Sequence, residues 1–117
     1  ILTGYKNKEE IEKYMLESSL FLMASVSEGL PMVLLEAMSY GIPCIAYHTD
    51  SGTDDIIKDN KNGYIINNRN EKEYINKIEK VIKDDKLRIK LGKEAKSTAY
   101  DFSKEKITEK WLKILNK

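Results

Sequence analysis

The stretch SEGLPMVLLEAMSYGIPC, residues 27–44, decides how this chain is interpreted. Its centre, Pro31 to Tyr40, is largely apolar and predicts a buried helix, since proline is favoured at the first helical position. Two carboxylates interrupt the apolar run, Glu28 and Glu36, with seven residues between them. A carboxylate in apolar surroundings costs free energy unless it is paired or hydrogen-bonded, so each of the two needs a partner.

Apolar runs on both sides of this helix alternate with amphipathic runs, which is typical of strand and helix units in a parallel sheet. Strands are expected at 1–5, 20–25, 42–47 and 64–68. Helices are expected at 7–18, 71–83, 85–99 and 103–115, with a helical turn around Ile56 and Ile57. We therefore predict an α/β fold, a partial Rossmann-like domain with a parallel sheet flanked by helices and a helical C-terminal part.

The four expected strands are fewer than the roughly six of a complete doubly wound domain. We therefore expect residues 1–117 to be the C-terminal domain of a longer, two-domain protein. Twenty basic and 19 acidic residues give a net charge of +1, which argues against a nucleic-acid surface. No apolar run of about 18 residues and no signal peptide are visible, so we expect a cytoplasmic location.

Cysteine and histidine, the usual ligands of transition metals, occur only once each in this chain. The single cysteine, Cys44, lies in an apolar run and is expected to be a buried, inert thiol. The single histidine, His48, is expected to be an ordinary loop residue, the alternative being a side chain that faces a ligand cleft. Asp50, Asp54 and Asp55 form an acidic loop without the EF-hand pattern, so no metal site is expected.

The start of the helix at Pro31 is short of hydrogen-bond partners. Leu30, the expected N-cap, has no side-chain oxygen, so the N–H groups of Met32 and Val33 lack an obvious acceptor. Water or a loop side chain such as Ser27 would satisfy them, and so would an anion. A helix N-terminus that follows a strand and a glycine-containing loop is a suitable site for a diphosphate.

The two glutamates have different expected partners. Glu36, in the second turn of the helix, suits the two hydroxyls of a ribose, and a lysine or arginine of the fold would serve equally well. Glu28 precedes the helix and would repel phosphate. It suits the hydroxyls of a sugar, or positive charge that develops on a sugar ring, unless it is simply a solvated loop carboxylate.

At this point the sequence resembles a known family. SEGLPMVLLEAMSYGIPCIAY is similar to the signature of two glutamates, with seven residues between them, in the retaining, nucleotide-sugar-dependent glycosyltransferases of family 4, also called glycosyl transferases group 1, which have the GT-B architecture. Gly29, Gly41, Pro43 and Gly63 stand at their expected places. Nearly the whole chain follows the C-terminal, donor-binding domain of that family.

The resemblance implies a role for each residue of the signature. It assigns the donor ribose to Glu36 and gives Glu28 the catalytic position beside the donor sugar. The remaining donor-binding positions, whose backbone reaches toward the sugar and diphosphate, are Gly29, Leu30, Pro31, Met32 and Val33. No metal or other cofactor is implied. The basic residues that clamp the diphosphate come from outside the matched motifs.

The resemblance also implies an activity. The enzyme would transfer a sugar from a nucleotide sugar, expected to be a UDP sugar, with retention to a glycan or lipid-linked acceptor held by a missing N-terminal domain. "EGLP" is closer to enzymes of bacterial capsule, polysaccharide and lipopolysaccharide synthesis, which allows peripheral association with the inner face of a membrane. The isolated chain is expected to be inactive.

Two other functions remain open from the sequence. One is a nucleotide-sugar epimerase of the same architecture. The other is a non-catalytic, helix-rich interaction module in which Glu28 and Glu36 merely form salt bridges. An apolar stripe on the last helix is expected to cover the missing domain or to drive self-association; it consists of Trp111, Leu112, Ile114 and Leu115.

Overall fold

The predicted α/β fold is confirmed by a computed structural model, which describes residues 7–24, 32–50 and 52–116. Three parallel strands lie in the order β1 (Phe21–Met23), β2 (Cys44–Tyr47), β3 (Gly63–Ile66). The helices are α1 (Lys8–Glu17), α2 (Met32–Ser39), α3 (Thr53–Ile56), α4 (Glu71–Lys83), α5 (Asp85–Asp101) and α6 (Lys104–Leu115). A short 3-10 turn, η1 (Asn67–Arg69), follows β3.

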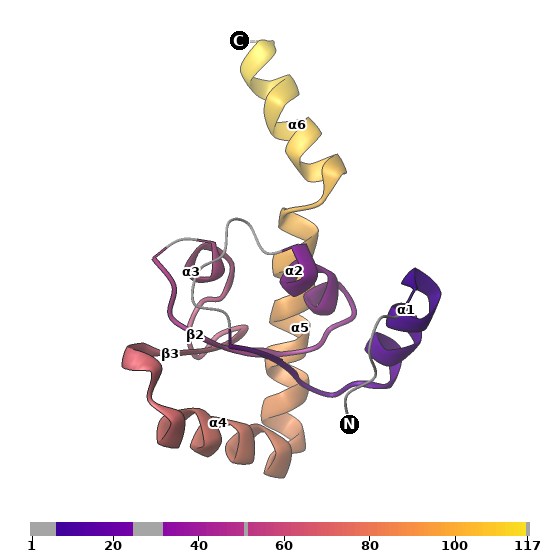
Figure 1. The fold of residues 1–117 in the computed structure, drawn as a ribbon. Coiled ribbons are helices and arrows are strands. Elements are labelled where there is room, and N and C mark those ends of the chain that lie inside the picture. The colour runs from indigo at the N-terminus through magenta and orange to yellow at the C-terminus, as the bar shows by residue number, and fades with distance from the viewer. Residues whose placement is uncertain (1–6, 25–31, 51, 117) are drawn as a thin grey trace.

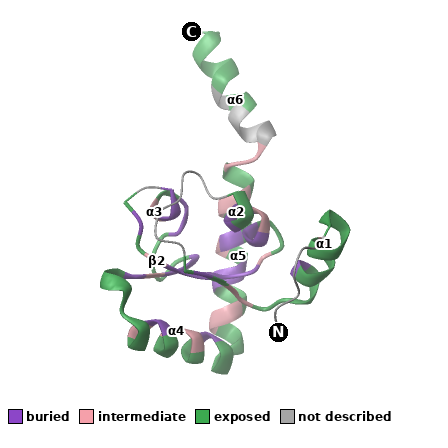
Figure 2. Ribbon diagram, viewed as in Figure 1, coloured by how far each residue is buried: buried purple, intermediate pink, exposed green. Residues whose placement is uncertain are grey.

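Helices cover both faces of the sheet. In Figure 1, α4 lies on one side, α2 and α3 lie on the other, and α5 runs past the sheet. Successive side chains of β2 alternate between these faces, as in any strand. Cys44 and Ala46 belong to the apolar cluster with α2 and α3, whereas Ile45 belongs to the cluster with α4. The buried residues of Figure 2 therefore form a core on each side of the sheet.

Three helices begin at side-chain caps that the sequence carries. Asn7, Asn70 and Asp84 each accept a hydrogen bond from the backbone N–H three residues later, which satisfies one of the unpaired donors of a helix start. The predicted helix 71–83 agrees with α4 at both ends. The apolar periodicity that predicted this helix also places Tyr74 and Val81 in the core.

The end of α2 is a backbone motif that requires glycine. Gly41 has φ +75°, and its N–H donates to the carbonyl of Met38, while Ile42 N–H donates to that of Ala37. These two hydrogen bonds form a Schellman motif, which ends the helix at a residue in the left-handed conformation. A glycine of α5 packs on the same turn: a Cβ at Gly92 would lie 2.3 Å from the Gly41 carbonyl oxygen.

The structure differs from the sequence prediction at the last strand. The predicted strand 64–68 ends at Ile66, because Asn68 and Arg69 adopt left-handed backbone angles, φ 56° and 47°. Such angles end a strand and turn the chain toward α4. The predicted strand 1–5 lies outside the described residues.

The last helix, α6, extends away from the rest of the molecule (Figure 1). Its apolar stripe is exposed (Figure 2), with exposed fractions of 60%, 52%, 59% and 71% for Trp111, Leu112, Ile114 and Leu115. The stripe therefore has no partner among the described residues. No helix in the described part of the chain combines the length and apolar content that a membrane span requires.

The contact at Gly92 generates a stability prediction. In an unobstructed helix, Gly→Ala would stabilise by about 1 kcal/mol. Here the added methyl group collides with the Gly41 carbonyl, so Gly92→Ala should instead lower the free energy of unfolding by about 1–3 kcal/mol, measured by urea denaturation. The exposed neighbour variant Lys93→Ala should leave it nearly unchanged. A Gly92→Ala protein as stable as the wild type would contradict the close contact.

Candidate functional site

The site is built at one edge of the sheet. Because the three strands are parallel, their carboxyl ends meet at the same edge, where ligands of open α/β sheets bind. Ala24 follows β1, His48 follows β2 and Asn67 follows β3. The chain passes from Ala24 through residues 25–31 to the start of α2.

Helix α2 has a core face and an open face. Leu34, Ala37 and Met38 are fully buried against the sheet and α5. The other face presents Glu36, half-buried in the second turn, to a cavity of about 400 Å³. Seven residues line this cavity: Lys8, Met32, Leu35, Glu36, Ser39, Ala99 and Phe102.

The carboxylate of Glu36 has no hydrogen bond or ion pair with any described residue. Only its backbone carbonyl is engaged, accepting a hydrogen bond from the Ser39 hydroxyl at 2.6 Å. Lys8 lines the same cavity without pairing with it. Of the two partners that the sequence left open for Glu36, a basic side chain is therefore not found in the described part of the fold. The carboxylate stays available to a ligand in the cavity.

The first turn of α2 offers a second feature. Met32 and Val33 are exposed, at 67% and 44%, and no acidic residue lies in this turn. The first amides of an α-helix have no acceptor within the helix, and its N-terminus carries partial positive charge. A helix N-terminus suited to an anion and the Glu36 cavity are therefore accessible from the same end of α2.

The other predicted site residues lie outside the described part of the chain. These are Glu28, Gly29, Leu30 and Pro31. Their roles stay predictions. Of the described residues on either side of segment 25–31, Ala24 directly follows β1 and Met32 is the first residue of α2.

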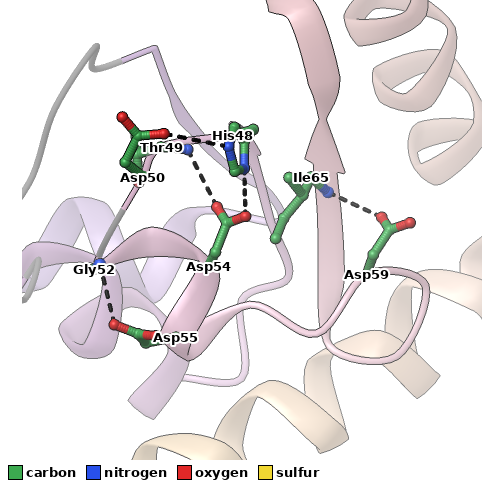
Figure 3. A network of polar contacts seen from close by, with 8 residues as sticks. All are labelled: His48, Thr49, Asp50, Gly52, Asp54, Asp55, Asp59 and Ile65. Carbon is green, nitrogen blue, oxygen red and sulfur yellow. Dashed lines mark hydrogen bonds and ion pairs between the residues drawn. The ribbon is translucent and has the colours of Figure 1, made fainter.

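His48 belongs to a polar network between β2 and α3 (Figure 3). Its Nδ1 lies 2.5 Å from the Asp54 carboxylate, and its Nε2 lies 3.8 Å from that of Asp50. The other oxygen of Asp54 accepts a hydrogen bond from the Thr49 N–H at 3.2 Å. His48 is therefore a loop residue that ties the end of β2 to α3.

The other aspartates of this loop also have structural roles. The Asp55 carboxylate caps the start of α3, accepting a hydrogen bond from the Gly52 N–H at 3.2 Å (Figure 3). The hydroxyl of Thr53 is buried, with no hydrogen-bond partner in the described ranges. No group of three or more His, Cys, Asp or Glu residues in the described ranges is arranged to hold a metal ion.

Cys44 is fully buried on β2, as predicted. Burial raises the pKa of its thiol well above the usual range, because the charged thiolate would lose its hydration. Only the thiolate is a good nucleophile, so this side chain is inert at neutral pH.

Two residues that support the site were missed by the sequence analysis. The Tyr74 hydroxyl on α4 lies 3.2 Å from the carbonyl of Met23, the last residue of β1, and 3.0 Å from the carbonyl of Ile45 within β2. The Arg69 guanidinium donates to the Ala24 carbonyl at 2.8 Å. These contacts span 51, 29 and 45 residues, so no local pattern indicates them.

The known proteins to which this chain is similar include glycosyltransferases. The family model for glycosyl transferases group 1 matches residues 1–98. The amylovoran biosynthesis glycosyltransferase AmsD of Erwinia amylovora is 34% identical over 108 residues, 92% of this chain and 30% of that protein.

Two solved structures share the fold. The C-terminal domain of the group 1 family protein LpcC from Francisella tularensis is 26% identical with a TM-score of 0.75, over 91% of this chain and 53% of that one. A mutant of S. aureus TarM, in complex with fondaparinux, alpha-GlcNAc-glycerol and UDP, is 32% identical with a TM-score of 0.79, over 100% of this chain and 24% of that one. The chain thus spans under a third of the length of AmsD and TarM.

The Tyr74 contacts predict a loss of stability in Tyr74→Phe. Removing a buried hydroxyl that serves two carbonyls should cost about 1–2 kcal/mol in urea denaturation at pH 7, whereas the exposed control Tyr100→Phe should cost little.

The same variant has a predicted pH dependence. Burial raises the pKa of Tyr74 above its ordinary 10.0, so above pH 10 the unfolded chain releases a proton that the folded chain keeps. The stability contributed by the neutral hydroxyl is complete below pH 10 and falls as the pH rises further. The difference between wild type and Tyr74→Phe should therefore narrow in alkaline solution. A constant difference up to pH 11 would contradict the burial of this hydroxyl.

Proposed function

This chain belongs to the glycosyl transferases group 1 family, and from that membership we propose that residues 1–117 form the C-terminal, nucleotide-sugar-binding domain of a two-domain sugar transferase. The similarity to an isolated C-terminal domain from the family supports this assignment. The donor would bind at the carboxyl edge of the sheet, and the acceptor would bind to the rest of the protein.

The Glu36 cavity is the observation that carries the proposal. A half-buried carboxylate without a partner among the described residues is costly, and a ribose diol would relieve that cost with one hydroxyl to each oxygen. The volume of about 400 Å³ lies within the range of small-molecule sites. The apolar walls, among them Leu35 and Phe102, suit a nucleoside better than a bare phosphate.

The diphosphate would lie at the N-terminus of α2. One turn separates the first residue of α2, Met32, from Glu36, which matches the order of diphosphate and ribose in a nucleotide. Amides of the segment Gly29 to Val33 would donate to the phosphate oxygens. They would also stabilise the negative charge that builds on the nucleoside diphosphate as it departs.

Glu28 would serve the sugar. Its carboxylate would accept hydrogen bonds from sugar hydroxyls and stabilise the positive charge that develops at the anomeric carbon as the bond to the diphosphate breaks. The acceptor hydroxyl would then bond through its oxygen to that carbon with retention of configuration and pass its proton to the departing diphosphate. We propose no metal ion or other cofactor for this step.

UDP is the nucleotide that we propose, because the TarM structure contains it and is 32% identical to this chain. The likeness to an amylovoran biosynthesis enzyme supports a bacterial surface polysaccharide or lipopolysaccharide as the product. A glycan or a lipid-linked sugar would be the acceptor. The protein would work in the cytoplasm, peripherally at the inner face of the membrane where the acceptor is lipid-linked.

Glu36→Gln tests the ribose site. The change keeps the size of the side chain but removes the charge that strengthens its hydrogen bonds, so UDP should bind the full-length protein about 10- to 100-fold more weakly in isothermal titration calorimetry. Glu94→Gln is the matched control: Glu94 is a half-buried helical glutamate that does not line the cavity, and its variant should bind UDP normally.

Three results would count against the proposal. Equal UDP affinity in Glu36→Gln and wild type would show that Glu36 does not bind the ribose. Equal weakening in both variants would indicate a general effect of losing a carboxylate. If the wild type binds neither UDP nor any other nucleotide, the proposed donor site is refuted.

A further inference from the structure

Arg69 reaches across the carboxyl edge of the sheet. It lies in η1, directly after β3, yet its Nη2 donates to the carbonyl of Ala24, directly after β1, at 2.8 Å. Because β2 lies between these strands, the side chain crosses the end of β2 on the way. There its Cζ lies 4.3 Å from the centroid of the Tyr47 ring.

The contacts around Arg69 form a continuous support. Tyr47 packs against Tyr74, with ring centroids 4.6 Å apart, and the Tyr74 hydroxyl contacts the Met23 carbonyl. The last two described carbonyls of the β1 segment, those of Met23 and Ala24, are therefore both held by residues that follow β3. These two carbonyls precede the segment that contains Glu28.

The backbone of η1 is shaped for this contact. Asn68 and Arg69 both have left-handed φ angles, 56° and 47°, which are unfavourable for residues with a side chain. Unfavourable backbone of this kind persists where the surrounding structure requires it, and it is concentrated at functional sites. In this chain it accompanies the turn of the guanidinium toward Ala24.

We propose that Arg69 is a positioning residue of the donor site: it fixes the end of β1 at Ala24, which precedes Glu28 by four residues in the sequence. The inference rests on the proposed function, since it concerns Glu28. A guanidinium suits this task because its planar group can stack on Tyr47 and donate to Ala24 at the same time, which a lysine ammonium cannot do as well.

The test separates the sugar end of the site from the nucleotide end. Arg69→Met in the full-length enzyme should leave the dissociation constant for UDP within about twofold, since Arg69 does not line the Glu36 cavity. The kcat for UDP release, measured with whichever UDP sugar the wild type turns over fastest, should fall about 10- to 100-fold, as expected for a misplaced catalytic group.

Two further variants complete the design. Arg88→Met is the matched control, since Arg88 also donates to backbone carbonyls, those of Val81 and Ile82, but lies outside the site; its kcat should stay at the wild-type value. Arg69→Lys keeps the charge and the approximate length of the side chain, and it replaces Arg69→Met if that variant fails to fold. It should recover only part of kcat. Added guanidinium ion at low concentration should raise the kcat of an Arg69→Ala variant and not that of the wild type.

The outcomes distinguish this inference from the proposed function. Wild-type kcat in Arg69→Met would overturn the positioning role while leaving the donor site intact. A parallel loss of UDP affinity and kcat would also overturn it, because that result describes a general support of the fold. A wild-type enzyme that neither binds UDP nor releases it from any UDP sugar would refute the proposed function, and the role of Arg69 with it.

Discussion

The contact between Gly92 of α5 and the Gly41 turn fixes the helix on which the site depends. Without a Cβ at Gly92, α5 approaches the carbonyl that ends α2, and the two helices pack closely along their length. Helix α2 is thereby held between the sheet and α5. Further along the chain, Ala99 in α5 and Phe102, which directly follows α5, line the cavity beside Glu36. A backbone contact at the end of α2 thus determines where a carboxylate in its second turn lies.

The site combines features that are individually common. A parallel sheet provides the edge, the first turn of α2 provides unpaired amides, and Glu36 provides a carboxylate with no partner among the described residues. Each feature has an ordinary structural explanation by itself. The unpaired amides and Glu36 lie on one eight-residue helix at that edge. This order, together with the family membership, favours a nucleotide whose diphosphate meets the amides and whose ribose meets Glu36.

Local sequence patterns predicted most of the helices and the place of Glu36. Helix α4 was predicted to the residue, since its caps and apolar spacing are both local signals. The contacts that hold the site were not predictable in this way. Arg69 meets Ala24 across 45 residues, and the buried side chain of Asn62 donates to the Thr98 hydroxyl 36 residues away. Such pairs are set by tertiary packing, which periodicity does not describe.

The central claim is that the cavity beside Glu36 receives the ribose of the donor. The most direct measurement is an intermolecular nuclear Overhauser experiment on the full-length protein saturated with UDP, with its methionine methyl groups labelled. Met32 lines the cavity and is exposed, so its methyl group should show contacts to the ribose protons. Saturating UDP whose ribose protons contact other methyl groups, and not that of Met32, would contradict the account.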